Sequence, residues 1–271
     1  MLVLACAFAL AGHADASAPP VRTLIAVGDI ASCDSNGDEQ TAALVSRTPG
    51  TIAVLGDIAY ESGSESDFAN CFEPSWGKLV PRIRAALGNH EYNTGSAAPA
   101  IKLFRLPQNG WYSYALGAWH VIVLNSNCDK IGGCERDSPQ GRWLRADLAA
   151  HPARCTLAYW HAPRFSSGIH GSDTTYAPFW DILAKAKADI VLSGHDHDYE
   201  RFAPLKGIRS FVVGTGGKSH YPTLIPRPGS VVRNSNAFGV LRLRLRPTAY
   251  EWKFLPAGTD TFTDAGSGRC R

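Results

Sequence analysis

The sequence predicts an α/β protein, and two patterns carry that prediction. Short apolar, β-prone runs recur along the chain at 23–27, 51–55, 83–87, 156–160 and 189–193. Continuous apolar runs of about five residues suit strands that are buried on both faces. Helix-like stretches lie between these runs, at 39–46, 141–150 and 176–188. Strands that alternate with helices indicate an α/β sheet.

The composition supports an ordinary globular chain. Of the 271 residues, 45% are hydrophobic and 19% are charged, which excludes a disordered, collagen-like or coiled-coil protein. The formal net charge of +3 is too small to indicate a nucleic-acid partner. The sequence indicates no membrane span, because its one membrane-like stretch, residues 1–12, is too short to cross a bilayer. Nothing in the sequence decides the oligomeric state.

The N-terminal residues resemble an export signal. Residues 1–12 are apolar and Ala-rich, residues 13–18 offer the small-residue pattern of a cleavage site, and Pro19-Pro20 follows. We therefore predict a signal peptide over residues 1–18 and a single catalytic domain over residues 19–271, secreted or periplasmic. A buried N-terminal helix is the alternative. No Lys or Arg precedes the apolar run, so the true start of the signal stays open.

The cysteines agree with export. The chain has seven cysteines, and six remain once Cys6 leaves with the signal, an even number compatible with three disulfides in an oxidising compartment. No pair has C-x-x-C spacing, so a zinc knuckle or thioredoxin-like site is disfavoured. Six cysteines allow fifteen pairings. Two glycines between Cys128 and Cys134 permit a tight closed loop, so we expect that pair first. For the other four cysteines we predict the pairs Cys33–Cys71 and Cys155–Cys270.

The C-terminal third has a different pattern. Residues 238–246 alternate with period two, which predicts a strand with leucines inward and arginines outward. Residues 250–255 look like its hairpin partner, and 93–99 and 222–236 look like loops. His120 lies in a run typical of a core strand, and neither it nor His151 or His220 is assigned any chemistry.

Polar residues with ligand-type side chains follow each of these five apolar runs. The five runs end in Gly28-Asp29, Gly56-Asp57, Gly88-Asn89-His90, His161, and Gly194-His195-Asp196-His197. In open α/β sheets, ligands bind beyond the carboxyl ends of the strands, so these tips should converge. Each Gly-Asp or Gly-His alone could be a turn, because both residues are common there. Five tips of one form favour a single site.

The chemistry of these side chains indicates a metal centre. They supply oxygen and imidazole ligands and no thiolate, a set that suits Fe, Mn or Zn. The candidates are too many for one ion: Asp29, Asp57, Tyr60, Asn89, His90, His161, His195 and His197. A carboxylate such as Asp57 can bridge two ions about 3.5–4 Å apart. The pattern therefore predicts a di-metal site at the carboxyl ends of the strands.

The ordered blocks carry a family resemblance. Gly28-Asp29, Gly56 to Tyr60, Gly88 to Glu91, Trp160-His161 and Gly194 to His197 together resemble the calcineurin-like metallophosphoesterases over most of the chain. Many members have a histidine ligand where this chain has Ala31, and Tyr60 closes the second block instead. That pattern is similar to the purple acid phosphatases, in their compact single-domain form. Glycine is frequent there at the position of Ala31, and the small methyl group should be harmless.

The resemblance implies a fold, a ligand set and a reaction. The fold would be a four-layer α/β/β/α sandwich. Asp29, Asp57, Tyr60 and His197 would hold one ion, expected to be Fe(III). Asp57, Asn89, His161 and His195 would hold the second, expected to be Fe, Zn or Mn. The catalytic residues His90 and His170 would face the phosphate or leaving group. The implied function is a secreted phosphatase that hydrolyses small-molecule phosphate monoesters by attack of a metal-bound hydroxide.

Other functions are compatible with part of this pattern. A phosphodiesterase or nucleotide hydrolase would use the same two ions. A non-catalytic secreted metal-binding protein is disfavoured, because no ligand position is lost. A serine nucleophile is disfavoured because the chain lacks the G-x-S-x-G elbow around Ser166-Ser167. Glu91 and Asp196 are assigned supporting roles, and Glu200 and Arg201 are expected to form a local ion pair.

Overall fold

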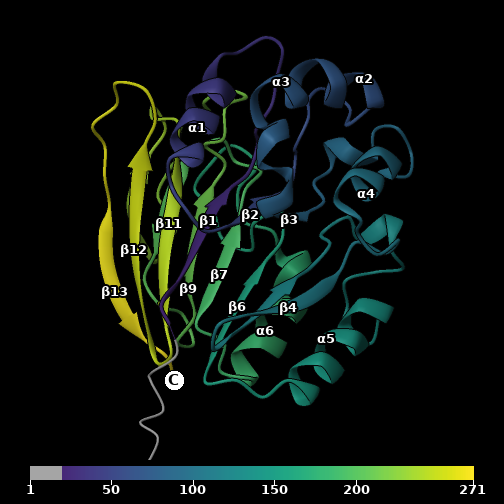
Figure 1. The fold of residues 1–271 in the computed structure, drawn as a ribbon. Helices are drawn as coiled ribbons and strands as arrows, with labels where there is room; N and C mark the ends of the chain where they lie inside the picture. Colours follow the sequence, from purple (N-terminus) through teal and green to yellow (C-terminus); the bar gives the residue numbers. More distant parts are fainter. Residues whose placement is uncertain (1–19) are drawn as a thin grey trace, which may run out of the picture.

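Two β-sheets with helices on their outer sides form the protein (Figure 1). The computed structural model describes residues 20–271, so the predicted signal peptide over residues 1–18 lies outside the described residues. No helix in the described part of the chain is long and apolar enough to cross a membrane.

The first sheet has six strands in the order β13-β12-β11-β1-β2-β3. The strands β1, β2 and β3 are parallel, and the other three pair antiparallel at one edge. Their bounds are β1 Arg22–Val27, β2 Thr51–Leu55, β3 Ile83–Ala86, β11 Gly239–Arg246, β12 Ala249–Pro256 and β13 Ala265–Arg269.

The second sheet has seven strands in the order β10-β8-β9-β7-β6-β5-β4. The central strands β9, β7, β6 and β5 are parallel, so their carboxyl ends meet at one edge. The bounds are β4 Tyr112–Leu116, β5 Trp119–Val123, β6 Cys155–Tyr159, β7 Ile190–Ser193, β8 Tyr199–Phe202, β9 Arg209–Val213 and β10 Ser230–Asn234.

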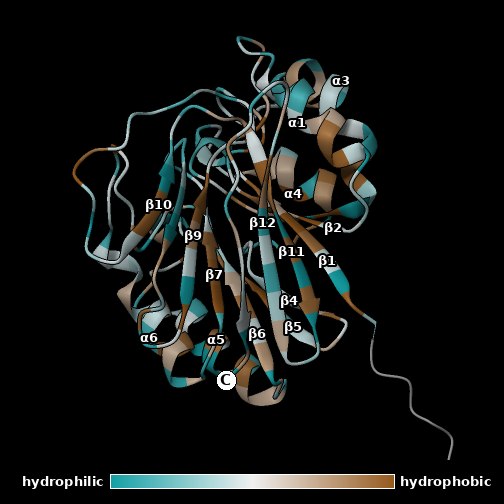
Figure 2. Cartoon of the chain, turned by 90° about the vertical axis from the view of Figure 1, so that its left-hand side faces the viewer, coloured by the Kyte–Doolittle hydropathy of each residue, from teal (hydrophilic) through white to brown (hydrophobic). Residues whose placement is uncertain are grey.

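Helices cover the outer face of each sheet. In Figure 2, α1 and α3 lie on the side of β1 and β2, and α5 and α6 lie on the side of the second sheet. The α-helices are α1 Gly37–Ser46, α2 Glu65–Asp67, α3 Glu73–Trp76, α4 Ala98–Phe104, α5 Pro139–Ala150 and α6 Ala177–Lys185. Short 3-10 and π segments are η1 Phe68–Phe72, η2 Gly77–Arg82, η3 His90–Tyr92, η4 Cys128–Lys130 and η5 Thr174–Tyr176.

The burial of alternate residues confirms the predicted four-layer sandwich. Leu24 and Ala26 of β1 pack in a core that also holds residues of the second sheet, so they face the space between the sheets. Ile25 and Val27 pack instead with residues of α1 and α3. A third core lies between the second sheet and the helices α5 and α6. Both sheets are thus covered on two faces, which is why their parallel strands read as continuous apolar runs.

The predicted hairpin is confirmed, and it lies in the first sheet between β13 and β1. The strands β11 and β12 pair antiparallel over their whole length. Leu241, Leu243 and Leu245 are buried, whereas Arg242, Arg244 and Arg246 are half-buried or exposed. The period-two pattern therefore indicates that one face of β11 packs on the core and the other faces water.

Several elements differ from the sequence prediction. The predicted loop 222–236 contains β10, and α4 begins inside the predicted loop 93–99. The predicted helix 176–188 ends at Lys185. The helical segment over residues 65–82 and the strands β4, β8, β9 and β13 were not predicted. These are short or polar elements whose formation depends on tertiary pairing, which periodicity in the sequence does not report.

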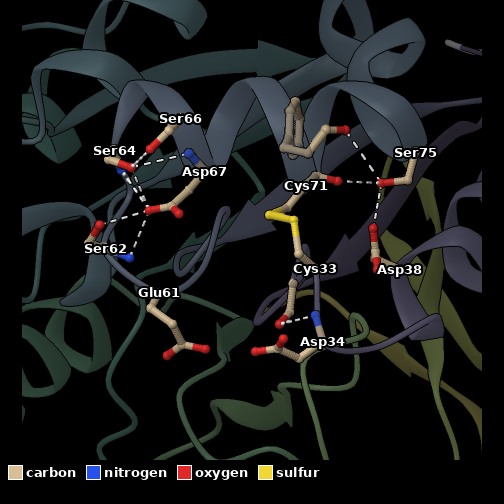
Figure 3. The surroundings of a disulfide bond; sticks show 12 residues. Cys33, Asp34, Asp38, Glu61, Ser62, Ser64, Ser66, Asp67, Cys71 and Ser75 are labelled. Carbon is tan, nitrogen blue, oxygen red and sulfur yellow. Dashed lines mark hydrogen bonds between the residues drawn. A yellow bond between two sulfur atoms is a disulfide. The ribbon is translucent and has the colours of Figure 1, made fainter.

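All three predicted disulfides are present. Cys33–Cys71, Cys128–Cys134 and Cys155–Cys270 have Cα–Cα distances of 4.9, 5.2 and 5.2 Å. Figure 3 shows the first of them joining the loop after β1 to η1, with the Ser75 hydroxyl donating to Asp38 nearby. The third joins β6 to the C-terminus, one residue from the end of the chain.

Candidate metal centre

The predicted tips of both sheets come together at one edge of the sandwich. Asp29, Asp57 and Asn89 follow β1, β2 and β3 of the first sheet, and His161, His195 and His197 follow β6 and β7 of the second. Hydrogen bonds and close contacts join these side chains into one cluster with Tyr60. Their role as ligands stays a prediction, but the structure gathers every predicted ligand in one place.

The backbone after β1 and β2 positions the two aspartates. The amide of Ile30 donates to the carbonyl of Asp57 at 2.9 Å, so the parallel pairing of the strands continues into their tips. Asp29 and Asp57 have φ of +61° and +47°, a left-handed conformation that non-glycine residues seldom adopt. Such backbone strain gathers at functional sites, where the surrounding structure holds it in place.

The first group of donor atoms surrounds the phenol of Tyr60. Its Oη lies 3.0 Å from Asp29 Oδ1, 3.1 Å from Asp57 Oδ2 and 3.2 Å from His197 Nε2. All four side chains are buried. His197 Nε2 also lies 3.4 Å from Asp29 Oδ1. This group contains the four residues predicted to hold the first ion.

The second group surrounds His161 Nε2. This nitrogen lies 3.0 Å from Asn89 Oδ1, 3.1 Å from His195 Nδ1 and 3.2 Å from Asp57 Oδ2. The Oδ2 atom of Asp57 therefore contacts both groups of donors. The residue predicted to bridge the two ions is therefore the one that the two groups share.

Hydrogen bonds from outside the site fix how the histidine rings face it. His161 Nδ1 donates to the carbonyl of Leu55 at 2.8 Å, because a carbonyl can only accept. Its Nε2 is thereby turned toward the oxygens of Asn89 and Asp57. His197 Nδ1 contacts Ser219 Oγ at 2.7 Å, which leaves its Nε2 for the site. Such partners orient imidazoles that bind metals.

The charges in the site are strongly coupled. Burial disfavours a charge on His161, yet the Asp57 carboxylate beside it raises the pKa of His161 to about 10. Burial also works against the Asp57 carboxylate, but His161 outweighs it and holds the pKa of Asp57 below its usual range. Burial and the charge of His161 lower the pKa of His195 to about 3.

These features fit a pair of cations. His161 Nε2 faces two oxygens, and one proton on it can point to only one of them. The donors are carboxylate, amide and phenol oxygens with imidazole nitrogens, which suit Fe, Zn or Mn. Asp57, His161 and His195 each offer a donor atom, and these atoms lie within 4.8 Å of one another. The first group would hold one ion and the second group the other.

Metal uptake by the metal-free protein is expected to release protons. The raised pKa of about 10 keeps His161 protonated at neutral pH, and an imidazole must lose that proton to bind a metal. The affinity should therefore increase as pH rises toward that pKa. Calorimetric titration of Zn²⁺ at pH 7, repeated in buffers of different ionisation enthalpy, should show about one proton released through this residue. Metal binding with no buffer dependence would contradict the expectation.

Glu91 supports the site from behind, as predicted. It is fully buried and accepts three backbone amides, from Ile58 at 2.7 Å, Gly88 at 2.8 Å and Asp57 at 3.0 Å. Burial and the nearby Asp57 raise the pKa of Glu91 to about 7. One carboxylate therefore holds together the tips of β2 and β3.

Replacing Glu91 with glutamine should loosen these tips. The amide group of Glu91→Gln presents N–H donors where the backbone also donates, so at least one buried amide loses its acceptor. We expect unfolding in urea to show a loss of about 2–4 kcal/mol. Glu65→Gln, at an exposed position, is the matched control and should change stability by less than about 0.5 kcal/mol. Equal stability of the two variants would contradict this role.

The two predicted catalytic histidines lie at the rim. His90 Nδ1 donates to the Glu61 carbonyl at 2.6 Å, and its Nε2 lies 3.8 Å from Asp57 Oδ2. The exposed His170 stacks on His195 with ring centroids 4.2 Å apart, and its backbone amide donates to Asp196 at 2.9 Å. The structure thus places both next to predicted ligands, with access to solvent.

The segment that follows β9 also reaches the site, although none of its residues was predicted to do so. Tyr221 stacks on His197 with centroids 4.0 Å apart and an angle of 9°. Lys218 Nζ lies 5.0 Å from the ring centroid of Tyr60. The strand β9 is parallel to β7, so its end reaches the same edge of the sheet. The Gly214-Thr-Gly-Gly run after its apolar residues was the signal that could have located it.

The predicted Glu200–Arg201 ion pair is wrong. Neighbouring residues of a strand point to opposite faces, so the two side chains in β8 have different partners. Arg201 Nε donates to Asp264 at 2.7 Å. Glu200 accepts from the amide and hydroxyl of Ser167, both at 2.7 Å.

Comparisons with known proteins agree with this fold and site. A family model described as calcineurin-like phosphoesterase matches residues 22–199. Purple acid phosphatase 22 of Arabidopsis thaliana is 28% identical over 230 residues, which cover 70% of this chain and 50% of that protein. Purple acid phosphatase 15 of the same plant is 24% identical over 216 residues, which cover 65% of this chain and 40% of that protein. The chain thus spans half or less of the length of these relatives.

Two solved structures share the fold. Purple acid phosphatase PPD1 from yellow lupin seeds superposes with a TM-score of 0.79 at 18% identity, covering 92% of this chain and 53% of that one. GAP50 of Plasmodium, described as the anchor in the inner membrane complex, superposes with a TM-score of 0.76 at 15% identity, covering 93% of this chain and 89% of that one.

Proposed function

Since the chain belongs to the calcineurin-like phosphoesterase family, we propose that it is a di-metal phosphatase of the purple acid type that hydrolyses small phosphate monoesters. The observation that carries this proposal is the position of Tyr60, whose hydroxyl lies within 3.2 Å of Asp29, Asp57 and His197. Fold alone would not support it, because GAP50 has the fold and is described as an anchor.

The environment of Tyr60 favours a ferric ion in the first group. Burial, and then the charge of Asp29, raise the pKa of Tyr60 well above its usual value. The phenol therefore ionises only when a strong Lewis acid replaces its proton. Among the candidate metals, Fe(III) has the highest charge, so we assign it to Asp29, Asp57, Tyr60 and His197. Fe, Zn or Mn is assigned to Asp57, Asn89, His161 and His195.

The residues around the two groups of donors would have separate roles in catalysis. Bound ions would supply a water of lowered pKa and neutralise phosphate charge. His90, whose Nδ1 is held by the Glu61 carbonyl, turns Nε2 toward the site and can give a proton to the leaving oxygen. His170, on the exposed side of His195, can bind a phosphate oxygen when protonated. Both roles require a protonated imidazole.

We also propose that the protein works in an oxidising compartment outside the cytoplasm. Three disulfides join segments 38, 6 and 115 residues apart, and such bonds persist mainly where thiols are not kept reduced. The predicted signal peptide supports the same proposal.

The proposal is tested by the colour and substrate preference of the purified protein. A tyrosinate bound to Fe(III) should give a visible absorption band, which Tyr60→Phe should lose. Tyr221→Phe is the matched control, because it removes a neighbouring tyrosine hydroxyl and keeps the ring that stacks on His197. An active, iron-free protein without the band would overturn the metal assignment.

An aryl monoester and an aryl diester should then be compared from acid to alkaline pH. Faster turnover of the monoester at acid pH is expected. Faster turnover of the diester would replace the proposal by a phosphodiesterase, and no turnover of either by fully loaded protein would leave a non-catalytic metal-binding protein.

A further inference from the structure

A second cluster of metal-ligating side chains lies away from the candidate metal centre. It consists of His120 on β5 with Asp147 and His151 at the C-terminal end of α5. Each residue offers one donor atom, and these atoms lie within 4.8 Å of one another. His120 is the second residue of β5, whereas the metal centre follows the carboxyl ends of strands parallel to β5. The cluster is therefore near the opposite edge of the sheet.

Asp147 lies between the two imidazoles. His120 Nε2 is 3.0 Å from Asp147 Oδ2, and His151 Nδ1 is 3.1 Å from Asp147 Oδ1. His120 and Asp147 are 6% and 7% exposed, whereas the His151 side chain is 59% exposed. His151 Nδ1 also donates to the backbone carbonyl of Asp147 at 3.0 Å, a hydrogen bond that this exposed ring gives up when it turns to bind an ion. Two buried donors therefore lie beside a third, exposed donor that can move.

The contact between His120 and Asp147 is not a hydrogen bond. Among the described residues, His120 Nδ1, His120 Nε2 and Asp147 Oδ2 have no hydrogen-bond partner. Since Nε2 and Oδ2 are only 3.0 Å apart, the oxygen must lie to the side of the ring N–H direction. A cation about 2.1 Å from both atoms requires that arrangement, because it sits on the nitrogen lone pair with the oxygen beside it. Buried polar atoms without partners are otherwise costly.

The surroundings fit a bound ion. Ser113 Oγ donates to Asp147 Oδ1 at 2.7 Å, an outer hydrogen bond of the kind that orients carboxylate ligands. A surface pocket of about 460 Å³, lined by residues that include Ser113, His120 and His151, opens onto the cluster. It gives an ion a way in and leaves room for a water as a further ligand. Burial lowers the pKa of His120, which keeps its lone pair available at neutral pH.

We propose that His120, Asp147 and His151 bind one Zn²⁺ ion, separate from the two ions of the candidate metal centre. Two imidazoles, one carboxylate and an open fourth position are a donor set that zinc takes. Donor atoms of a tetrahedral zinc site lie roughly 3.4 Å apart, so the two buried donors are nearly in place and His151 closes the site. The ion joins the end of α5 to β5.

Zinc titration of the metal-loaded protein tests the proposal. Protein that already holds its catalytic ions is equilibrated with excess ZnCl₂, freed of unbound metal and analysed for total bound metal by mass spectrometry. The wild type should hold one equivalent more than His151→Gln, whose replaced side chain is exposed and leaves the core intact. Arg154→Gln, at an exposed position nearby, is the matched control and should hold as much as the wild type.

Thermal unfolding gives a second measurement. At a free Zn²⁺ concentration about a hundred times Kd, the melting temperature of the wild type should rise by about 5 °C relative to the titrated His151→Gln protein. Equal metal content in the wild type and His151→Gln would overturn the proposal, because His151 would then not be a ligand of the additional ion. Loss of the equivalent in Arg154→Gln as well would also overturn it.

Discussion

Asp57→Asn is expected to lower kcat for an aryl phosphate monoester by at least about a thousandfold, the largest effect of any single substitution proposed for this protein. Both carboxylate oxygens of Asp57 are in use. Oδ1 accepts the backbone amide of His90 at 2.9 Å, and Oδ2 contacts the Tyr60 hydroxyl and His161 Nε2. An asparagine has one oxygen, so either the amide of His90 or the bridging contact must be lost.

The metal content of the variant should fall with its activity. A carboxylate that contacts both groups of donors contributes negative charge to both ions, and an amide contributes none. We expect Asp57→Asn to hold fewer metal equivalents than the wild type when both are loaded alike. Asp34→Asn, at an exposed position, is the matched control and should keep activity and metal. Full activity in Asp57→Asn would contradict the assignment of the bridging residue.

Removal of the Cys155–Cys270 disulfide should cost about 5 kcal/mol of unfolding free energy, the largest stability change among the proposed substitutions. The bond closes a loop of 115 residues, whereas Cys33–Cys71 closes 38 and Cys128–Cys134 closes 6. The entropy that a cross-link removes from the unfolded chain grows with the logarithm of loop length. The same relation gives losses of about 4 and about 2 kcal/mol for the two shorter loops.

Three double variants measure this order. Each replaces both cysteines of one pair with alanine, and guanidinium unfolding gives the free energy. The Cys128/Cys134 variant is the control, because it removes two sulfur atoms and a bond but a short loop. A larger loss in that variant than in the Cys155/Cys270 variant would show that native packing around the bonds, and not loop closure, decides the cost.

The sequence predicted the site better than it predicted the fold around it. The predicted metal ligands lie at the ends of buried parallel strands, where the apolar run stops abruptly at Gly28-Asp29 or Gly194-His195. That boundary is a local property of the chain, so it can be read without a structure. The strand β10 and the helical segment over residues 65–82 were missed. The strand β10 forms because it pairs with β8, and the helical segment packs on α1. No local sequence pattern indicates either partner.

Contacts between distant residues account for the errors at the side-chain level. Glu200 and Arg201 are adjacent in sequence and were paired for that reason. A strand sends neighbouring side chains to opposite faces, and Arg201 instead meets Asp264, 63 residues away. His120 was assigned no chemistry because its run is apolar. Only the packing of α5 on the second sheet brings Asp147 and His151 to it.

The sequence by itself determined the fold class, the order of the five strand tips and the kinds of side chain that they carry, because strand burial and residue chemistry are local properties of the chain. Tertiary structure alone decided that the tips of two separate sheets share one edge, so that Asp57 from one sheet meets His161 from the other at 3.2 Å. It also decided that Tyr221 covers His197. Distances between segments depend on how the sheets pack, and packing is a property of the whole chain.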